Sequence, residues 1–281
     1  MTLATEIQGT FADAKKPVVR RKPQPSFLTG PLPITFATGV ALLVAWDFVT
    51  RFGLASPLFL PSPSEVVEQF VAVAQDGYAN GTLAEHALAS LGRIGLAFLI
   101  ASSIGIPLGL LMGLNRWIKG VFDAPIGLYW PLPPLAYLPL LIIWLGIGET
   151  SKVVLLTLAM FAPICISAQA GVRSVSLERV HAALSLGANR RQIFTDIVFP
   201  SALPEILTGL RIAVGAGWST LVAAELIAAR SGLGYMIISA SNFLATDIVF
   251  VGLVVIAVFA IALSGAMRAL ERWLVPWKGK A

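Results

Sequence analysis

Charged side chains are scarce in this chain. They make up 12% of its 281 residues, against roughly 25% in an average soluble protein. Hydrophobic residues make up 57%, and they occur in uninterrupted runs that are too long to form one face of a soluble helix. These features exclude an ordinary soluble domain and predict an all-α polytopic membrane protein. In such a protein the net charge of +5 reports orientation in the membrane, so it does not indicate nucleic-acid binding.

Residues that commonly do chemistry are nearly absent. The single cysteine, Cys165, lies in an apolar run, which excludes a disulfide framework and a thiolate metal cluster. The two histidines, His86 and His181, are too few and too far apart for a metal site. The apolar runs carry no set of nucleophile, base and acid, which disfavours an intramembrane enzyme. The phosphate-binding sequence G-x-x-x-x-G-K-[ST] does not occur, so the chain cannot cradle nucleotide phosphates itself.

Six apolar segments are long enough to cross a membrane. The third contains prolines 125, 131, 133, 134 and 139, and these cannot all lie in one continuous helix because each removes an amide donor. Broken backbone at membrane depth is tolerated where protein or a water-filled cavity satisfies it. The stretch 129–139 is therefore a candidate for lining a pathway, and a kinked helix packed in the bundle is an equally good reading. The predicted spans are 31–52, 94–115, 121–147, 153–172, 206–229 and 248–267.

The remaining segments connect or flank the spans. Residues 1–30 form a basic tail, residues 31–272 the transmembrane domain, and residues 273–281 a second tail. Ser62, Pro63 and Glu65 fit a helix start, because serine caps the helix and glutamate follows three residues later. The helix that follows is expected to lie along the membrane surface. Residues 230–247 are apolar but short, which predicts an interfacial or re-entrant segment.

Two features inside the spans point to helix packing. Ala101, Gly105, Gly109 and Gly113 recur every four residues, a small-residue stripe that lets two membrane helices approach closely. Glu225 lies near the end of the fifth span and would be costly against lipid, so we expect it to face protein, water or headgroups.

Basic residues are distributed unevenly between the two sides that six spans define. Of the 20 Lys and Arg residues, fifteen lie on the side of both termini and of residues 173–204, and Arg211 lies within the fifth span. The bias places the termini and residues 173–204 in the cytoplasm. The opposite side carries the other four, Arg51, Arg93, Lys152 and Arg230.

The loop 173–204 separates the fourth and fifth spans. Its residues 178–204 read E-R-V-H-A-A-L-S-L-G-A-N-R-R-Q-I-F-T-D-I-V-F-P-S-A-L-P. Residues 177–193 predict a pair of amphipathic helices, and Gly187 allows the chain to turn between them. Pro200 and Pro204 are expected to end local helices and to restart the next one, which gives a rigid elbow into the fifth span.

The spacing in this loop resembles the "EAA" loop of permease subunits of ABC importers: E-A-A, three residues, G, nine residues, I-x-L-P. His181 stands where that family usually has glutamate, and Phe199 where it has leucine. The resemblance implies a six-helix type I importer permease whose loop docks on a separate ATPase. By this resemblance the docking residues are His181, Ala182, Ala183, Gly187, Ala188, Ile197 and Pro200.

The resemblance extends over nearly the whole chain beyond the basic tail. The sequences P-L-F-L-P-S-P-S-E-V (57–66), W-P-L-P-P-L-A-Y-L-P-L (130–140) and I-W-L-G-I-G-E-T-S-K (143–152) are similar to permeases for sulfonates, nitrate and related anions, as is 203–212. Residues 217–229 and 243–247 are most similar to taurine permeases.

This resemblance implies a bacterial inner-membrane protein that imports taurine or a related sulfonate. The implied partners are a second permease copy, an ATPase dimer that uses ATP and Mg, and a periplasmic substrate-binding protein. Another small anion as cargo, or less favourably a gradient-driven transporter, is the alternative. The candidate pathway residues are Tyr129, Trp130, Pro133, Pro134, Tyr137, Trp218 and Glu225.

Overall fold

The computed structural model describes residues 31–277, with side chains described from residue 33 onward. The predicted basic tail of residues 1–30, together with Lys278 and Lys280, therefore lies outside the described residues. The described part of the chain is helical nearly throughout, which confirms the predicted all-α fold. It divides into two compact units at Phe48 and Val49, and helix α2 (Pro31–Arg51) crosses that division.

Five helices are long and apolar enough to cross a membrane, and a bent helix pair brings the number to six among the described residues. The bent pair consists of α5 (Arg116–Tyr129) and the segment Pro134–Leu145, which meet at 92°. The predicted break of the backbone in the proline-rich stretch is thereby confirmed. The five long helices are α2, α4 (Leu83–Leu114), α7 (Glu149–Arg173), α10 (Phe199–Ala228) and α12 (Thr246–Leu274).

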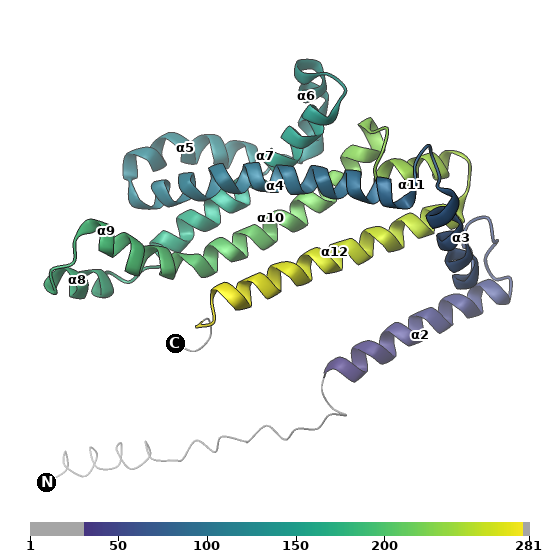
Figure 1. Ribbon diagram of the computed structural model, residues 1–281, viewed down its shortest axis with the longest axis horizontal. Coiled ribbons are helices and arrows are strands. Elements are labelled where there is room, and N and C mark those ends of the chain that lie inside the picture. The colour runs from purple at the N-terminus through teal and green to yellow at the C-terminus, as the bar shows by residue number, and fades with distance from the viewer. Residues whose placement is uncertain (1–30, 278–281) are drawn as a thin grey trace, which may run out of the picture. The chain divides into compact units, whose positions relative to one another are not determined.

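Helix α7 lies between α4 and α10 and packs along both of them (Figure 1). Helix α12 packs against α10 on the other side. Shorter elements gather at the two ends of this bundle: α8 (Leu177–Ser185) and α9 (Arg190–Gln192) lie at one end, and α11 (Leu233–Asn242) lies at the other. The remaining elements are α3 (Pro63–Asp76), η2 (Pro134–Tyr137), α6 (Leu138–Leu145) and the π-helical turn η3 (Ile193–Val198).

The small-residue stripe of α4 is the surface on which α7 packs, as the sequence predicts. A side chain at Gly109 would collide with the Cys165 carbonyl oxygen and would place its Cβ 2.7 Å from the Ala168 Cβ. One turn further on, Gly113 faces Val172 in the same way. The two backbones approach so closely that only glycine fits at these positions.

Replacing Gly109 with alanine is expected to destabilise the folded protein by about 1–3 kcal/mol, because the added methyl group overpacks the interface between α4 and α7. Gly95→Ala is the matched control, since it lies on the same helix and its Cβ would meet nothing within 4 Å. That control should be neutral or slightly stabilising. The check is the thermal midpoint of each purified variant. Equal midpoints for the two variants would contradict this account of the interface.

Capping residues fix where the helices begin. The predicted start of α3 is confirmed, since the Ser62 hydroxyl accepts from the Glu65 amide while the Glu65 carboxylate accepts from the Ser62 amide. Thr82 and Glu85 form the same reciprocal box at the start of α4. Helix α4 therefore begins at Leu83 and not at position 94, where the charge-free run starts.

Candidate functional site

Helix α8 carries the first residues of the candidate docking loop, and it contains no buried residue. Its flanking apolar side chains are strongly exposed, with Leu177 at 71% and Leu186 at 89%. His181 and Ala182 lie on this exposed helix, while Ala183 is half-buried. Exposed apolar side chains of this kind form a surface suited to contact with a protein partner.

Gly187 ends α8 in a left-handed conformation, with φ +85°. Its amide donates to the Leu184 carbonyl at 2.9 Å, and the next amide, Ala188, donates to the Ala183 carbonyl at 3.0 Å. This pair of hydrogen bonds is the Schellman motif, in which glycine is favoured because it adopts positive φ without strain. The turn predicted at Gly187 is therefore confirmed, and it involves Ala183 and Ala188 as well.

The next helix, α9, begins directly after this turn. Asn189 caps α9: its side chain accepts from the Gln192 amide, and the Gln192 side chain accepts from the Asn189 amide, both at 2.9 Å. Asn189 was not predicted as a cap, although N-x-x-Q is a recognisable capping box. The turn at Gly187 and the Asn189 cap together fix the angle between α8 and α9 through local hydrogen bonds.

Ile197 lies in the π-helical turn η3, which joins α9 directly to α10. Here the Phe199 amide donates to the Phe194 carbonyl, five residues earlier. Pro200 stands at the start of α10, as expected of a proline that restarts a helix, and proline is tolerated there because the first amides lack helical partners. The expectation that the two prolines end local helices is wrong, since η3 runs directly into α10 and Pro204 lies inside it. The loop therefore continues into the fifth span as one helical path.

Close contacts fasten the loop to the bundle at both of its ends. Gly171 near the end of α7 faces Ala202 of α10, where an added Cβ would lie 2.8 Å from the Ala202 carbonyl oxygen. The Arg179 guanidinium of α8 reaches the Ser201 hydroxyl at 3.4 Å. These contacts join α7 to α10 and α8 to α10 at the two ends of the loop.

Four of the candidate pathway residues meet around one small cavity of about 140 Å³. Tyr129 and Trp130 reach it from the end of α5, and Pro134 and Tyr137 reach it from η2. Pro133 precedes η2 directly and forms its N-terminal boundary. The bend between α5 and α6 therefore lines a hollow rather than a close-packed contact. Trp218 lies elsewhere, against a cavity of about 220 Å³ between α10 and α12.

Glu225, the last candidate pathway residue, is wholly enclosed by protein, as one of the predicted alternatives stated. Its side chain is 0% exposed, and the Arg93 guanidinium of α4 contacts it at 2.5 Å. The Ser90 hydroxyl donates to the same carboxylate at 2.8 Å, and the Gly234 amide donates at 2.9 Å. One carboxylate thereby joins α4, α10 and α11.

The same arginine continues the network to α7. The Arg93 guanidinium also pairs with Glu149 at 2.5 Å, and Lys152 pairs with Glu149 at 2.7 Å. Arg93 and Lys152 were counted among the surface charges of the side opposite the termini, but both are buried, at 5% and 2% exposure. They serve as internal counter-charges, which is the usual role of basic residues inside membrane bundles.

The backbone at the start of α11 packs against the ion-pair network around Glu225. Gly232 has φ +119°, and a Cβ there would lie 2.6 Å from an Arg93 nitrogen. Its amide donates to Nδ1 of His86 at 3.1 Å, so that nitrogen is the acceptor of a neutral imidazole. The other ring nitrogen, Nε2, then donates to the Tyr78 carbonyl oxygen at 2.9 Å. His86 thus holds the connection after α3 against α11.

Comparison with known proteins decides the class. Residues 105–276 match the family described as binding-protein-dependent transport system inner membrane component. The chain belongs to this family. The taurine transport system permease protein TauC of Escherichia coli is 53% identical over 88% of this chain and 90% of its own length. The putative aliphatic sulfonates transport permease protein SsuC of the same organism is 36% identical over 85% and 89%.

A solved structure agrees with the fold. The methionine ABC transporter MetNI, described in inward-facing conformations, aligns with a TM-score of 0.59 at 17% identity, covering 68% of this chain and 95% of the matched chain. The chain is therefore a multi-pass permease subunit of an ABC importer of the inner membrane, and it is not itself an enzyme. The family implies an ATPase and a substrate-binding protein as partners.

Proposed function

We propose that this permease imports taurine or a closely related small sulfonate by alternating access. The observation that carries the proposal is the 53% identity with TauC across nearly the whole transmembrane domain. The 36% identity with SsuC makes an alkanesulfonate the second candidate cargo. Nitrate and other small anions are further alternatives within the same architecture. The alternative of a gradient-driven transporter is not supported, because the chain belongs to a family of binding-protein-dependent permeases.

We further propose that the loop 173–204 couples the permease to its ATPase. The exposed helix α8, the Schellman turn at Gly187 and the continuous path through η3 into α10 support this role. The residues proposed to form or shape the docking surface are His181, Ala182, Ala183, Gly187, Ala188, Ile197 and Pro200. ATP and Mg would then be bound by the partner chain, whose hydrolysis cycle moves α8 as a rigid body.

The proposed assembly contains two copies of the permease, an ATPase dimer and a periplasmic binding protein. Both termini and the docking loop would face the cytoplasm, as the distribution of basic residues indicates. Burial of Arg93 and Lys152 in ion pairs strengthens that argument, because it leaves fewer free cations on the opposite side. The cavity beside Tyr129 and Tyr137 is the proposed part of the pathway.

Uptake of radiolabelled taurine is the direct test. Cells that lack their own sulfonate importers would express the permease with its ATPase and binding protein, and we expect accumulation that stops when the ATPase is omitted. Unlabelled taurine should compete best, followed by alkanesulfonates, with nitrate and bicarbonate weakest. Uptake that persists without the ATPase would reject the coupled mechanism, and stronger competition by nitrate would reject the sulfonate assignment while leaving the mechanism standing.

A further inference from the structure

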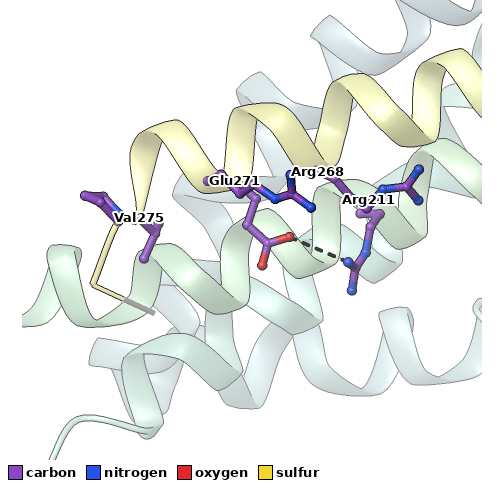
Figure 2. Close-up of a pocket in the computed structure, with 6 residues that line it drawn as sticks. Arg211, Arg268, Glu271 and Val275 are labelled. Carbon is purple, nitrogen blue, oxygen red and sulfur yellow. Dashed lines mark ion pairs between the residues drawn. The ribbon is translucent and has the colours of Figure 1, made fainter. Parts of the chain in front are cut away.

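An arginine-lined cavity of about 480 Å³ lies where the end of α12 passes beside α10 (Figure 2). Three arginines and one glutamate line it, giving a formal charge of +2. It is separate from the ion-pair network around Glu225 and from the cavity beside Tyr129. Its lining residues are Arg211, Arg268, Glu271, Arg272, Val275 and Pro276.

The positive charge in this cavity is only partly compensated. Figure 2 shows the Arg211 side chain of α10 extended toward Glu271 of α12, and the two groups are 3.6 Å apart. That separation is an ion pair but is longer than a hydrogen bond, so this contact leaves the N–H groups of Arg211 available as donors. Arg268 donates one hydrogen bond within its own helix, to the Ser264 hydroxyl at 2.9 Å. Guanidinium donors therefore border an open space.

The position of the cavity along the helices indicates what could reach it. A helix of 29 residues such as α12 is longer than the roughly 20 residues that cross the hydrocarbon core, and the cavity lies within its last two turns. Trp273 and Trp277 are exposed beside it, at 78% and 45%. Exposed tryptophans of this kind mark the headgroup level of a membrane. Basic pockets between helices at that level suit phosphate-bearing headgroups.

We propose that this cavity is a binding site for a singly charged tetrahedral oxyanion, with Arg211 and Arg268 as its principal donors. The planar guanidinium matches the oxygens of a phosphodiester or a sulfonate and binds them by paired hydrogen bonds. The same chemistry is offered by an anionic phospholipid headgroup and by a free sulfonate in solution. The site is independent of the proposed cargo, because it follows from the lining of the cavity alone.

The test is retention of lipid by the full-length permease, purified in detergent and then mixed with phosphatidylglycerol or phosphatidylcholine. Native mass spectrometry should show preferential retention of phosphatidylglycerol by the unmodified chain and at least a fivefold loss in the R211Q/R268Q double variant. The exposed single variant R268Q should lose part of it, which guards against misfolding of the double variant. R116Q is the matched control, since Arg116 is an exposed arginine outside the cavity on the same predicted side of the membrane.

Two further measurements test the charge of the cavity and the source of the bound oxyanion. Glu271→Gln raises the formal charge of the cavity to +3 and should increase retention. Free ethanesulfonate that displaces the lipid would identify a site open to soluble oxyanions, whereas failure to displace it would identify a headgroup site; both results support the proposal. Equal retention of the two lipids, or an equal loss in R116Q and in R211Q/R268Q, would overturn it.

Discussion

Replacing Arg93 with methionine is expected to destabilise the permease by about 3–5 kcal/mol, the typical cost of leaving one partner of a buried ion pair uncompensated. The carboxylate of Glu225 has no exposure to solvent, so water cannot solvate its charge when the guanidinium is removed. The hydroxyl of Ser90 and the amide of Gly234 would remain as its only close donors in the described cluster. Hydrogen bonds from neutral groups do not replace a buried counter-charge.

The single cysteine provides the measurement. Cys165 of α7 is buried against Met112 of α4 and Ile126 of α5, so its thiol reacts with a fluorogenic maleimide only when the bundle opens. The temperature at which labelling begins should fall strongly for Arg93→Met. Lys119→Met is the matched control: it also removes a cation from an ion pair, but Lys119 and Asp123 are 3.6 Å apart and partly exposed. Exposed pairs of that kind contribute less than about 1 kcal/mol.

A second substitution separates lost charge balance from lost packing. The double variant Arg93→Met with Glu225→Leu removes both charges and should recover much of the stability that the arginine variant loses, because an apolar pair can replace a buried ion pair at little cost. The difference between the double variant and the summed single variants gives the coupling between the two residues. Additive losses would contradict the ion-pair account and would favour simple packing defects.

This network marks the limit of what the sequence could predict. A carboxylate inside an apolar run needs a partner, and that much follows from the cost of a charge in lipid. The identity of the partner does not follow, because Arg93 and Glu225 are 132 residues apart and only the packing of α4 against α10 brings them together. Arg93 therefore looked like a surface charge at the edge of a span.

Features that depend on a local sequence pattern were predicted more accurately than contacts between residues far apart in the sequence. The glycine stripe of α4, the capping box at Ser62, the turn at Gly187 and the break among the prolines were all predicted correctly, since each pattern is contained within a single short segment of the sequence. The start of α4 was not predicted although its Thr82 and Glu85 box is local, because the first turns of the helix carry charged residues and extend beyond the charge-free run. The predicted helix end before Pro200 was wrong, since the wider π-helical turn there has no clear sequence signal.

Replacing Gly187 with valine is expected to reduce ATP-driven uptake at least tenfold while leaving the membrane bundle intact. The backbone there has φ +85°, a conformation in which a β-branched residue is strained by about 1–3 kcal/mol. A Cβ at this position would meet nothing within 4 Å, so the strain is purely conformational. Loss of the Schellman turn would change the angle between α8 and α9 and thereby displace the proposed docking surface.

Asparagine at the same position is the matched control, because it adopts the left-handed conformation far more readily than valine. Gly187→Asn should therefore retain ATPase co-purification and most of the uptake, whereas Gly187→Val should lose both. Thiol labelling of Cys165 should begin at the same temperature in both variants, since Gly187 is exposed and distant from the buried core. Equal loss of uptake in the two variants would show that any side chain at this position blocks docking, and the argument from turn conformation would then be wrong. Because the turn at Gly187 is followed directly by α9, η3 and α10, its conformation sets how α8 is joined to the fifth span.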